Sequence, residues 1–270
     1  MLRSTALWSL SAALLLGTGS CERLKEIGID PFPAEDDVEL GRQVAEQIAA
    51  DPDTYPILSE VDFPDAYGHI QRIMASILNS PDLDYVDVFA YDSIKIIHDD
   101  EVLNAFATPG GYIYVYTGLI KYLDTEDQLA GVLGHEIAHA EKRHGTDALI
   151  RQLGAQTLLD VVLGDNSENQ IAQVLTGLVQ LQFGREAEEE SDEWSVIYLS
   201  ATNYQCNGAA GFFQKLEEQG AGGGGPEFLS THPSPDNRIT DINAKATEEG
   251  CDTTPLNPDT YAAFKASLPE

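Results

Sequence analysis

Apolar residues recur at helical spacing along most of this chain, and the pattern changes only over a short central region. A stripe formed by Val38, Val44 and Ile48 predicts the first helix. The same spacing predicts further helices over residues 66–78, 149–163 and 171–183. The chain is therefore expected to be mainly helical.

Runs of Val, Ile and aromatic residues in the central region predict short strands. Two of these predicted strands are Asp84–Tyr91 and Ile94–His98. Two more, Asn104–Ala107 and Ile113–Tyr116, surround the turn sequence Pro109-Gly110-Gly111. We therefore expect an α+β fold with a small antiparallel sheet. The last two strands form either an edge that accepts an extended peptide or an ordinary packed hairpin.

The next predicted helix contains His135-Glu136-Ile137-Ala138-His139, and Thr125 with Gln128 forms a capping box at its start. Histidines four residues apart lie on one face of a helix, so His135 and His139 can bind one metal ion. Glu136 follows the first histidine and can reach a water molecule on that metal as a general base. The pattern H-E-x-x-H is typical of zinc peptidases.

A catalytic zinc site needs a third protein ligand. On a continuous helix His144 would lie on the face opposite His135, so we expect it to be structural. The metzincin pattern requires a histidine six residues after His139, where Gly145 stands. The acidic run Arg185–Asp192 offers several carboxylates on a later helix, and spacing does not choose among them.

The net charge of −30, from 45 acidic and 15 basic residues, excludes nucleic acid and anionic membrane surfaces as partners bound through charge. A hydrophobic content of 43% distinguishes the chain from acidic disordered proteins. The acidic excess is therefore interpreted as a solvated surface.

Residues 1–20 predict an export signal, because a basic start precedes the apolar run Ala6–Leu16, which is too short to span a bilayer. Gly17–Cys21 resembles a bacterial lipobox, although Thr18 stands where leucine is usual. We expect a lipid anchor at Cys21 that holds the protein on the periplasmic side of the bacterial outer membrane. Cleavage by ordinary signal peptidase is the alternative.

Residues 21–35 then predict a tether, and residues 36–270 predict a single metallopeptidase domain. Outside the cytoplasm, Cys206 and Cys251 can form a disulfide, and two buried free thiols are the alternative.

His135–His139 together with Glu188-x-x-x-Asp192, about fifty residues later, resembles the CAAX-prenyl-protease-like family of zinc metallopeptidases. This family includes HtpX-like membrane proteases and the periplasmic BepA-like and LoiP-like proteins. The resemblance implies a gluzincin-type domain with one Zn²⁺ per chain. It also implies that Glu188 is the third zinc ligand and that Asp192 orients a ligand histidine.

The resemblance extends to the strand Asn104–Ala107 and to Thr231–Ser234, which Arg238 follows. It implies that Asn104 and Ala105 bind an extended polypeptide substrate. It further implies that His232 approaches the zinc, either to steady the oxyanion or to occupy the fourth site in a latent form. A structural histidine in a Pro-rich turn is the alternative.

These features predict a zinc-dependent endopeptidase that cleaves misfolded or unassembled envelope proteins, in the service of protein quality control. The chain carries no multispanning helices and no helical-repeat array, so we expect the short periplasmic lipoprotein members to match best. The alternative function is a chaperone-like factor with little proteolysis that works with the outer-membrane assembly machinery.

Overall fold

A computed structural model describes residues 32–164, 168–218, 227–233, 237–256 and 259–270 of the chain. The predicted signal peptide, Cys21 and most of the predicted tether lie outside these residues. Phe32 is buried, and helix α2 (Ala34–Ala50) begins two residues later. The last four residues of the predicted tether therefore belong to the packed domain. Among the described helices, none is both long enough and apolar enough to cross a bilayer.

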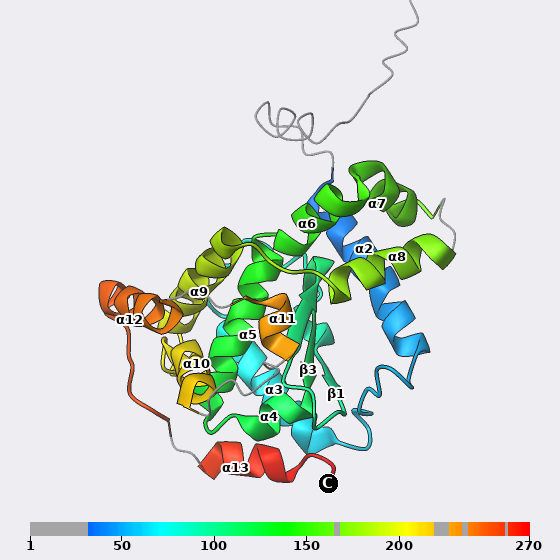
Figure 1. The fold of residues 1–270 in the computed structure, drawn as a ribbon. Coiled ribbons are helices and arrows are strands. Elements are labelled where there is room, and N and C mark those ends of the chain that lie inside the picture. Colours follow the sequence, from blue (N-terminus) through cyan, green and yellow to red (C-terminus); the bar gives the residue numbers. More distant parts are fainter. Residues whose placement is uncertain (1–31, 165–167, 219–226, 234–236, 257–258) are drawn as a thin grey trace, which may run out of the picture. The chain divides into compact units, whose positions relative to one another are not determined.

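Helix α5 (Glu126–Glu141) lies at the centre of the domain, between the sheet and helices α9 (Arg185–Ser200) and α10 (Gly208–Glu218) (Figure 1). The hydroxyl of Thr125 accepts the N–H of Gln128 at 3.2 Å, which confirms the predicted cap. Fifteen of the sixteen residues in α5 are buried, including all its polar ones except Gln128. Each polar group on this helix therefore needs a partner from the surrounding elements.

The sheet has the strand order β1-β3-β2, from Lys95–Ile97, Tyr112–Tyr116 and Ala105–Thr108. Strands β2 and β3 form the predicted antiparallel hairpin across the short 3₁₀ turn Pro109–Gly111. Strand β1 pairs with β3 in parallel, so the sheet is mixed rather than wholly antiparallel. Strand β2 runs opposite to β1, and the hairpin then reverses the chain again, so β3 runs in the same direction as β1. The α+β class is confirmed.

The predicted strand Asp84–Tyr91 is wrong. The carboxylate of Glu141 accepts the N–H groups of Asp84 and Tyr85 at 2.7 and 3.1 Å. The carbonyl of Tyr85 then accepts the N–H groups of Val88 and Phe89, which folds the segment into turns. Because these backbone donors are satisfied within the turns and by α5, no strand ladder is needed to satisfy them.

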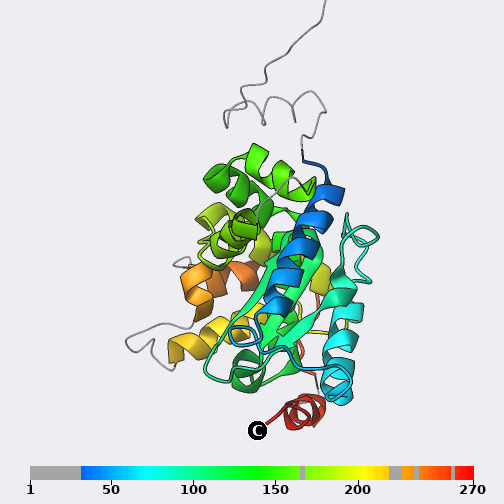
Figure 2. The ribbon, with the colours of Figure 1, turned by 90° about the vertical axis from the view of Figure 1, so that its right-hand side faces the viewer.

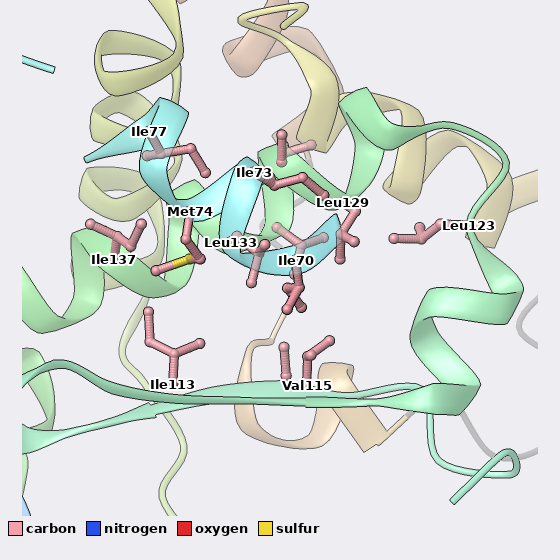
Figure 3. Close-up of a cluster of buried hydrophobic side chains, with 14 of the residues drawn as sticks. Ile70, Ile73, Met74, Ile77, Ile113, Val115, Leu123, Leu129, Leu133 and Ile137 are labelled. Atoms are coloured by element: carbon pink, nitrogen blue, oxygen red, sulfur yellow. The ribbon is translucent and has the colours of Figure 1, made fainter. Parts of the chain in front are cut away.

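The larger hydrophobic core lies between helix α3 (Pro64–Ile77), α5 and the sheet. Side chains from one face of α3 meet those of α5 and β3 in Figure 3. The labelled side chains from these three elements are Ile70, Ile73, Met74, Ile77, Leu129, Leu133, Ile137, Ile113 and Val115. This packing fixes one side of α5 against the sheet.

A second core joins α2 to helices α6 (His144–Leu153), α7 (Ala155–Val162) and α8 (Glu168–Val179). In both ribbon views these helices gather at one end of the domain (Figures 1 and 2). The predicted helix 149–163 is divided between α6 and α7, because Gly154 has a φ of 86° that interrupts helical geometry. The remaining helices are α4 (Thr117–Tyr122), α11 (Glu227–Thr231), α12 (Arg238–Glu249), α13 (Asp259–Ala266) and the 3₁₀ turn Tyr91–Ser93.

Cys206 and Cys251 form a disulfide across a sequence separation of 45, with their Cα atoms 6.2 Å apart. This settles the choice between a disulfide and free thiols. The bond joins the loop before α10 to the end of α12. Both helices lie near α5 and α9, so the disulfide restrains the part of the chain that encloses the central helix.

We expect the variant Cys206→Ala/Cys251→Ala to unfold with a free energy about 4 kcal/mol lower than that of the oxidised chain, because the closed loop restricts the unfolded state. Urea unfolding checks this value. The reduced wild-type chain is the matched control and should behave like the variant. Equal stabilities for the oxidised chain and the variant would contradict the prediction.

Candidate metal centre

Four buried side chains converge beside α5. His135 and His139 come from α5, Glu188 comes from α9, and His232 directly follows α11. Their exposed fractions are 1%, 3%, 0% and 1%, and one donor atom from each lies within 4.8 Å of all the others. The structure thus brings together the three predicted ligands and His232, which the resemblance implied would approach the metal.

The spacing of these donors suits a small tetrahedral metal ion. His135 Nε2 lies 3.0 Å from His139 Nε2 and 3.3 Å from His232 Nδ1. Glu188 Oε1 lies 3.4 Å from His139 Nε2 and 3.0 Å from His232 Nδ1. Ligands bound at ~2.0–2.1 Å to a tetrahedral ion lie about 3.3 Å from one another. The donor set fits a metal ion in chemistry and in size.

A buried arginine balances the carboxylates around these donors. Asp192 Oδ1 lies 2.8 Å from His135 Nδ1, on the side of the ring away from the donor atom. The guanidinium of Arg238 forms two hydrogen bonds with Asp192, at 2.6 and 2.8 Å, and its Nη1 lies 3.1 Å from Glu188 Oε2. Arg238 also stacks on Phe213 at 4.0 Å. The sequence motif included Arg238, but only the packing of α12 against α9 reveals its partners.

Glu136 lies beside the donor cluster, with one oxygen hydrogen-bonded and the other, Oε1, 3.6 Å from His232 Nε2. Its Oε2 accepts the backbone N–H of Ala107 at 3.1 Å. Within the described part of the chain, the buried Oε1 has no hydrogen-bond partner. Burial raises the pKa of Glu136 to about 7. A carboxylate with such a pKa and an unpaired oxygen is suited to accept a proton.

Glu188 is ionised although it is fully buried. Burial by itself would raise its pKa, but contacts with the rings of His139 and His232 outweigh that effect and hold the pKa well below its usual range. The side chain therefore presents a negative charge to the cluster, as a metal ligand requires.

The predicted position of His144 is wrong. Helix α5 ends at Glu141, Arg143 adopts a left-handed conformation with a φ of 56°, and His144 begins α6. The chain therefore turns back, and His144 Nδ1 lies 3.0 Å from His139 Nδ1. His144 remains outside the group of donor atoms. The other two histidines, His69 and His98, are also outside that group.

A cavity of about 250 Å³ opens beside Glu136, between β2 and the segment that follows α8. Asn104, Phe106 and Ala107 line one side of this cavity, and Phe183 and His232 line another. Asn104 Oδ1 is buried and has no hydrogen-bond partner among the described residues. The other predicted substrate residue, Ala105, has a fully buried side chain that is not part of the lining.

Comparison with known proteins agrees with this geometry. The profile of peptidase family M48 matches residues 67–246, which include all four donor residues. The chain belongs to this family. The predicted resemblance to metallopeptidases of the HtpX and BepA type is thereby confirmed.

Three relatives show how far the similarity extends. The putative beta-barrel assembly-enhancing protease of Vibrio cholerae is 29% identical over 218 residues, which cover 72% of this chain and 45% of that protein. The beta-barrel assembly-enhancing protease of Escherichia coli K12 is 29% identical over 243 residues, or 76% and 50% of the two chains. The mitochondrial metalloendopeptidase OMA1 of Arabidopsis thaliana is 31% identical over 140 residues, which cover 52% of this chain and 28% of that protein. The chain thus spans half or less of the length of these relatives.

We expect Arg238→Met to lower the free energy of unfolding of the metal-free protein by about 3–5 kcal/mol, because it leaves Glu188 and Asp192 buried without their cation. The same variant should gain more stability from added metal than the wild type does, because the centre becomes more negative. Urea unfolding with and without Zn²⁺ measures both effects.

Arg72→Met is the matched control for this experiment. Arg72 pairs with Glu126 at 2.6 Å, but its side chain is 45% exposed. Arg72→Met should lower the free energy of unfolding by less than Arg238→Met does. It should leave the stabilisation by added Zn²⁺ unchanged. A metal response in Arg238→Met equal to that of the control would contradict the charge balance described above.

Proposed function

We propose that this protein is a zinc-dependent endopeptidase in which Glu136 is the general base. The observation that carries the proposal is the buried Oε1 of Glu136, which has no hydrogen-bond partner among the described residues and lies beside a complete set of metal donors. Membership of peptidase family M48 supports the same reaction class. Two imidazoles and a carboxylate are a common ligand set for catalytic zinc, which supports zinc as the metal.

His135, His139 and Glu188 would hold the ion. When bound, a zinc ion acts as a Lewis acid and lowers the pKa of a coordinated water molecule from 15.7 to roughly 7. Asp192 would accept the Nδ1–H of His135 and so keep the Nε2 of that ring free for the metal.

The proton transfers would depend on Glu136. Its Oε1 takes a proton from the water that attacks the peptide carbonyl, and afterwards delivers this proton to the leaving amine. The hydrogen bond from Ala107 to Oε2 holds the carboxylate in one orientation during both transfers. Because the residue is buried, bulk water does not compete for Oε1.

The edge of the sheet would bind the substrate as an extended chain. Strand β2 is at the edge, and the N–H of Tyr116 donates to the carbonyl of Asn104 at 3.0 Å. The N–H and C=O groups of successive residues point to opposite sides of an antiparallel strand. Because those of Asn104 face β3, those of Ala105 point away from it. Ala105 is fully buried in the described arrangement, so an extended polypeptide can pair with these groups only after the edge is uncovered. The Oδ1 of Asn104, which lines the cavity and has no hydrogen-bond partner among the described residues, can accept one of its N–H groups.

His232 would act as a removable fourth donor. Its Nδ1 lies 3.3 Å from His135 Nε2 and 3.0 Å from Glu188 Oε1, which is the spacing of ligands around one tetrahedral ion. Catalytic zinc sites keep this fourth position for water, so His232 must leave it before the reaction. We infer that the described arrangement is latent, in preference to a role for His232 in steadying the oxyanion.

The place of action that we propose is the bacterial envelope. The export signal and the lipobox at Cys21 support a protein anchored on the periplasmic side of the outer membrane. The names of two bacterial relatives refer to beta-barrel assembly, which supports misfolded or unassembled envelope proteins as substrates. The same names support a partnership with the outer-membrane assembly machinery as part of this proposal.

We expect Glu136→Gln to retain its metal and to lose cleavage of an unfolded outer-membrane protein by about 10²–10⁴-fold, because no base accepts the proton. Metal content and gel-based cleavage assays check this pair of results. Glu186→Gln is the matched control, because Glu186 is exposed at the start of α9. Undiminished cleavage by metal-loaded Glu136→Gln would refute the mechanism.

The chaperone-like alternative is tested with the same variant in cells. If the protein only assists assembly, Glu136→Gln should support normal levels of assembled outer-membrane proteins. Under the endopeptidase proposal it should instead accumulate misassembled forms.

We expect His232→Ala to cleave the same substrate faster than the wild type does, because the fourth position becomes open. Initial rates at saturating Zn²⁺ measure the effect, with His69→Ala as the control for loss of a histidine outside the site. Loss of cleavage with metal retained would support the oxyanion role instead.

A further inference from the structure

The ring of His139 is contacted on the side opposite the donor cluster by a second histidine. His139 Nε2 faces His135 Nε2, whereas His139 Nδ1 lies 3.0 Å from His144 Nδ1. The other nitrogen of His144, Nε2, lies 3.2 Å from Glu190 Oε2. These contacts form a chain that runs from the donor cluster through His139 and His144 to a carboxylate at the surface.

The chemistry of these groups assigns the protons along the chain. The carboxylate of Glu190 only accepts hydrogen bonds, so the hydrogen of His144 belongs on Nε2. The Nδ1 of a neutral His144 is then an acceptor, and the hydrogen of His139 belongs on its own Nδ1. This leaves the Nε2 lone pair of His139 directed at the other donors, as metal binding requires.

The local backbone holds His144 in this place. Arg143 is the only described non-glycine residue with a positive φ, and its Nε donates to Asp37 Oδ2 at 2.5 Å. The hydroxyl of Thr146 donates to Asp37 Oδ1 at 2.7 Å. A left-handed residue costs about 1–2 kcal/mol, and contacts with α2 offset that cost. The reversal between α5 and α6 is thus fixed by side chains on both sides of His144.

The ring of His139 is also restrained from one face. Phe183 stacks on it with the centroids 4.0 Å apart. Stacking limits the tilt of the ring but does not choose which nitrogen carries the hydrogen. In the metal-free chain that choice lies between the contact of Nδ1 with His144 and the carboxylate of Glu188, whose Oε1 lies 3.4 Å from Nε2.

We propose that His144 is a positioning residue, which holds His139 in the tautomer that presents Nε2 to the metal. Asp192 makes the corresponding contact to His135 at 2.8 Å. The two ligand histidines would therefore be oriented by different groups, one by a carboxylate and the other by a neutral imidazole. The inference rests on the metal site of the proposed function, but not on the cleavage of any peptide.

The test compares His144→Leu with His144→Asn. Leucine removes the acceptor, whereas the side-chain oxygen of asparagine can stand near the place of Nδ1. Zinc affinity, from competition with a chromophoric chelator, should fall by about 10–100-fold in His144→Leu and by much less in His144→Asn. His69→Leu, at a histidine outside the cluster, should leave the affinity unchanged.

A second measurement uses the metal-free protein. Long-range ¹H–¹⁵N correlation spectra of the imidazoles identify the tautomer of each histidine. His139 should carry its hydrogen on Nδ1 in the wild type and in His144→Asn, and should lose that preference in His144→Leu. If His144→Leu does not fold, His144→Ala takes its place, because alanine also lacks an acceptor.

Unchanged affinity and tautomer in the leucine variant would overturn the inference. Equal losses in the asparagine and leucine variants would also overturn it, because packing rather than the hydrogen bond would then be responsible. A wild-type chain that binds no zinc would refute the proposed function, while the tautomer in the metal-free protein would still decide the role of His144.

Discussion

The burial of several carboxylates around one small centre is the constraint on which the rest of this structure depends. Glu136, Glu188 and Asp192 are all withdrawn from water, and isolated charges in such a position are very costly. Arg238 supplies a fixed positive charge between Glu188 and Asp192, and a metal ion held by the donors would supply more. Helix α12 must therefore pack against α9, because the arginine reaches both carboxylates only from there.

The central helix depends on similar compensation at both of its ends. Glu126 pairs with Arg72, and Asp127 accepts the backbone N–H groups of Gln205 and Leu256. Glu141, at the other end, accepts two backbone N–H groups and the hydroxyl of Tyr91. These carboxylates attach distant segments to a helix that has almost no contact with solvent. The helix that carries the ligand histidines is consequently held along its whole length, which preorganises the centre.

The proposed chemistry follows from how differently the two carboxylates nearest the cluster are paired. Contacts with the rings of two histidines keep Glu188 ionised, whereas burial raises the pKa of Glu136 to about 7. One side chain is thus suited to hold a cation and the other to exchange a proton. The backbone of Ala107 links this second side chain to the sheet edge at which we propose that substrate binds.

The sequence by itself determined the features that depend on local spacing. These are the ligand pair His135 and His139 on one helical face, the cap at Thr125, the hairpin around Pro109–Gly111 and the acidic helix at Arg185. Each of them depends on residues only a few positions apart, so periodicity and turn chemistry are sufficient. The resemblance to a known family was needed to choose Glu188 within the acidic run.

Only the tertiary structure decided the features that depend on distant contacts. The left-handed Arg143 is held by Asp37, 106 positions earlier, so no local pattern predicted that His144 would turn back to His139. The partners of Arg238 and the turns at Asp84–Tyr91 depend in the same way on α9 and on Glu141. Buried charges choose their partners in space, and sequence periodicity contains no information about that choice.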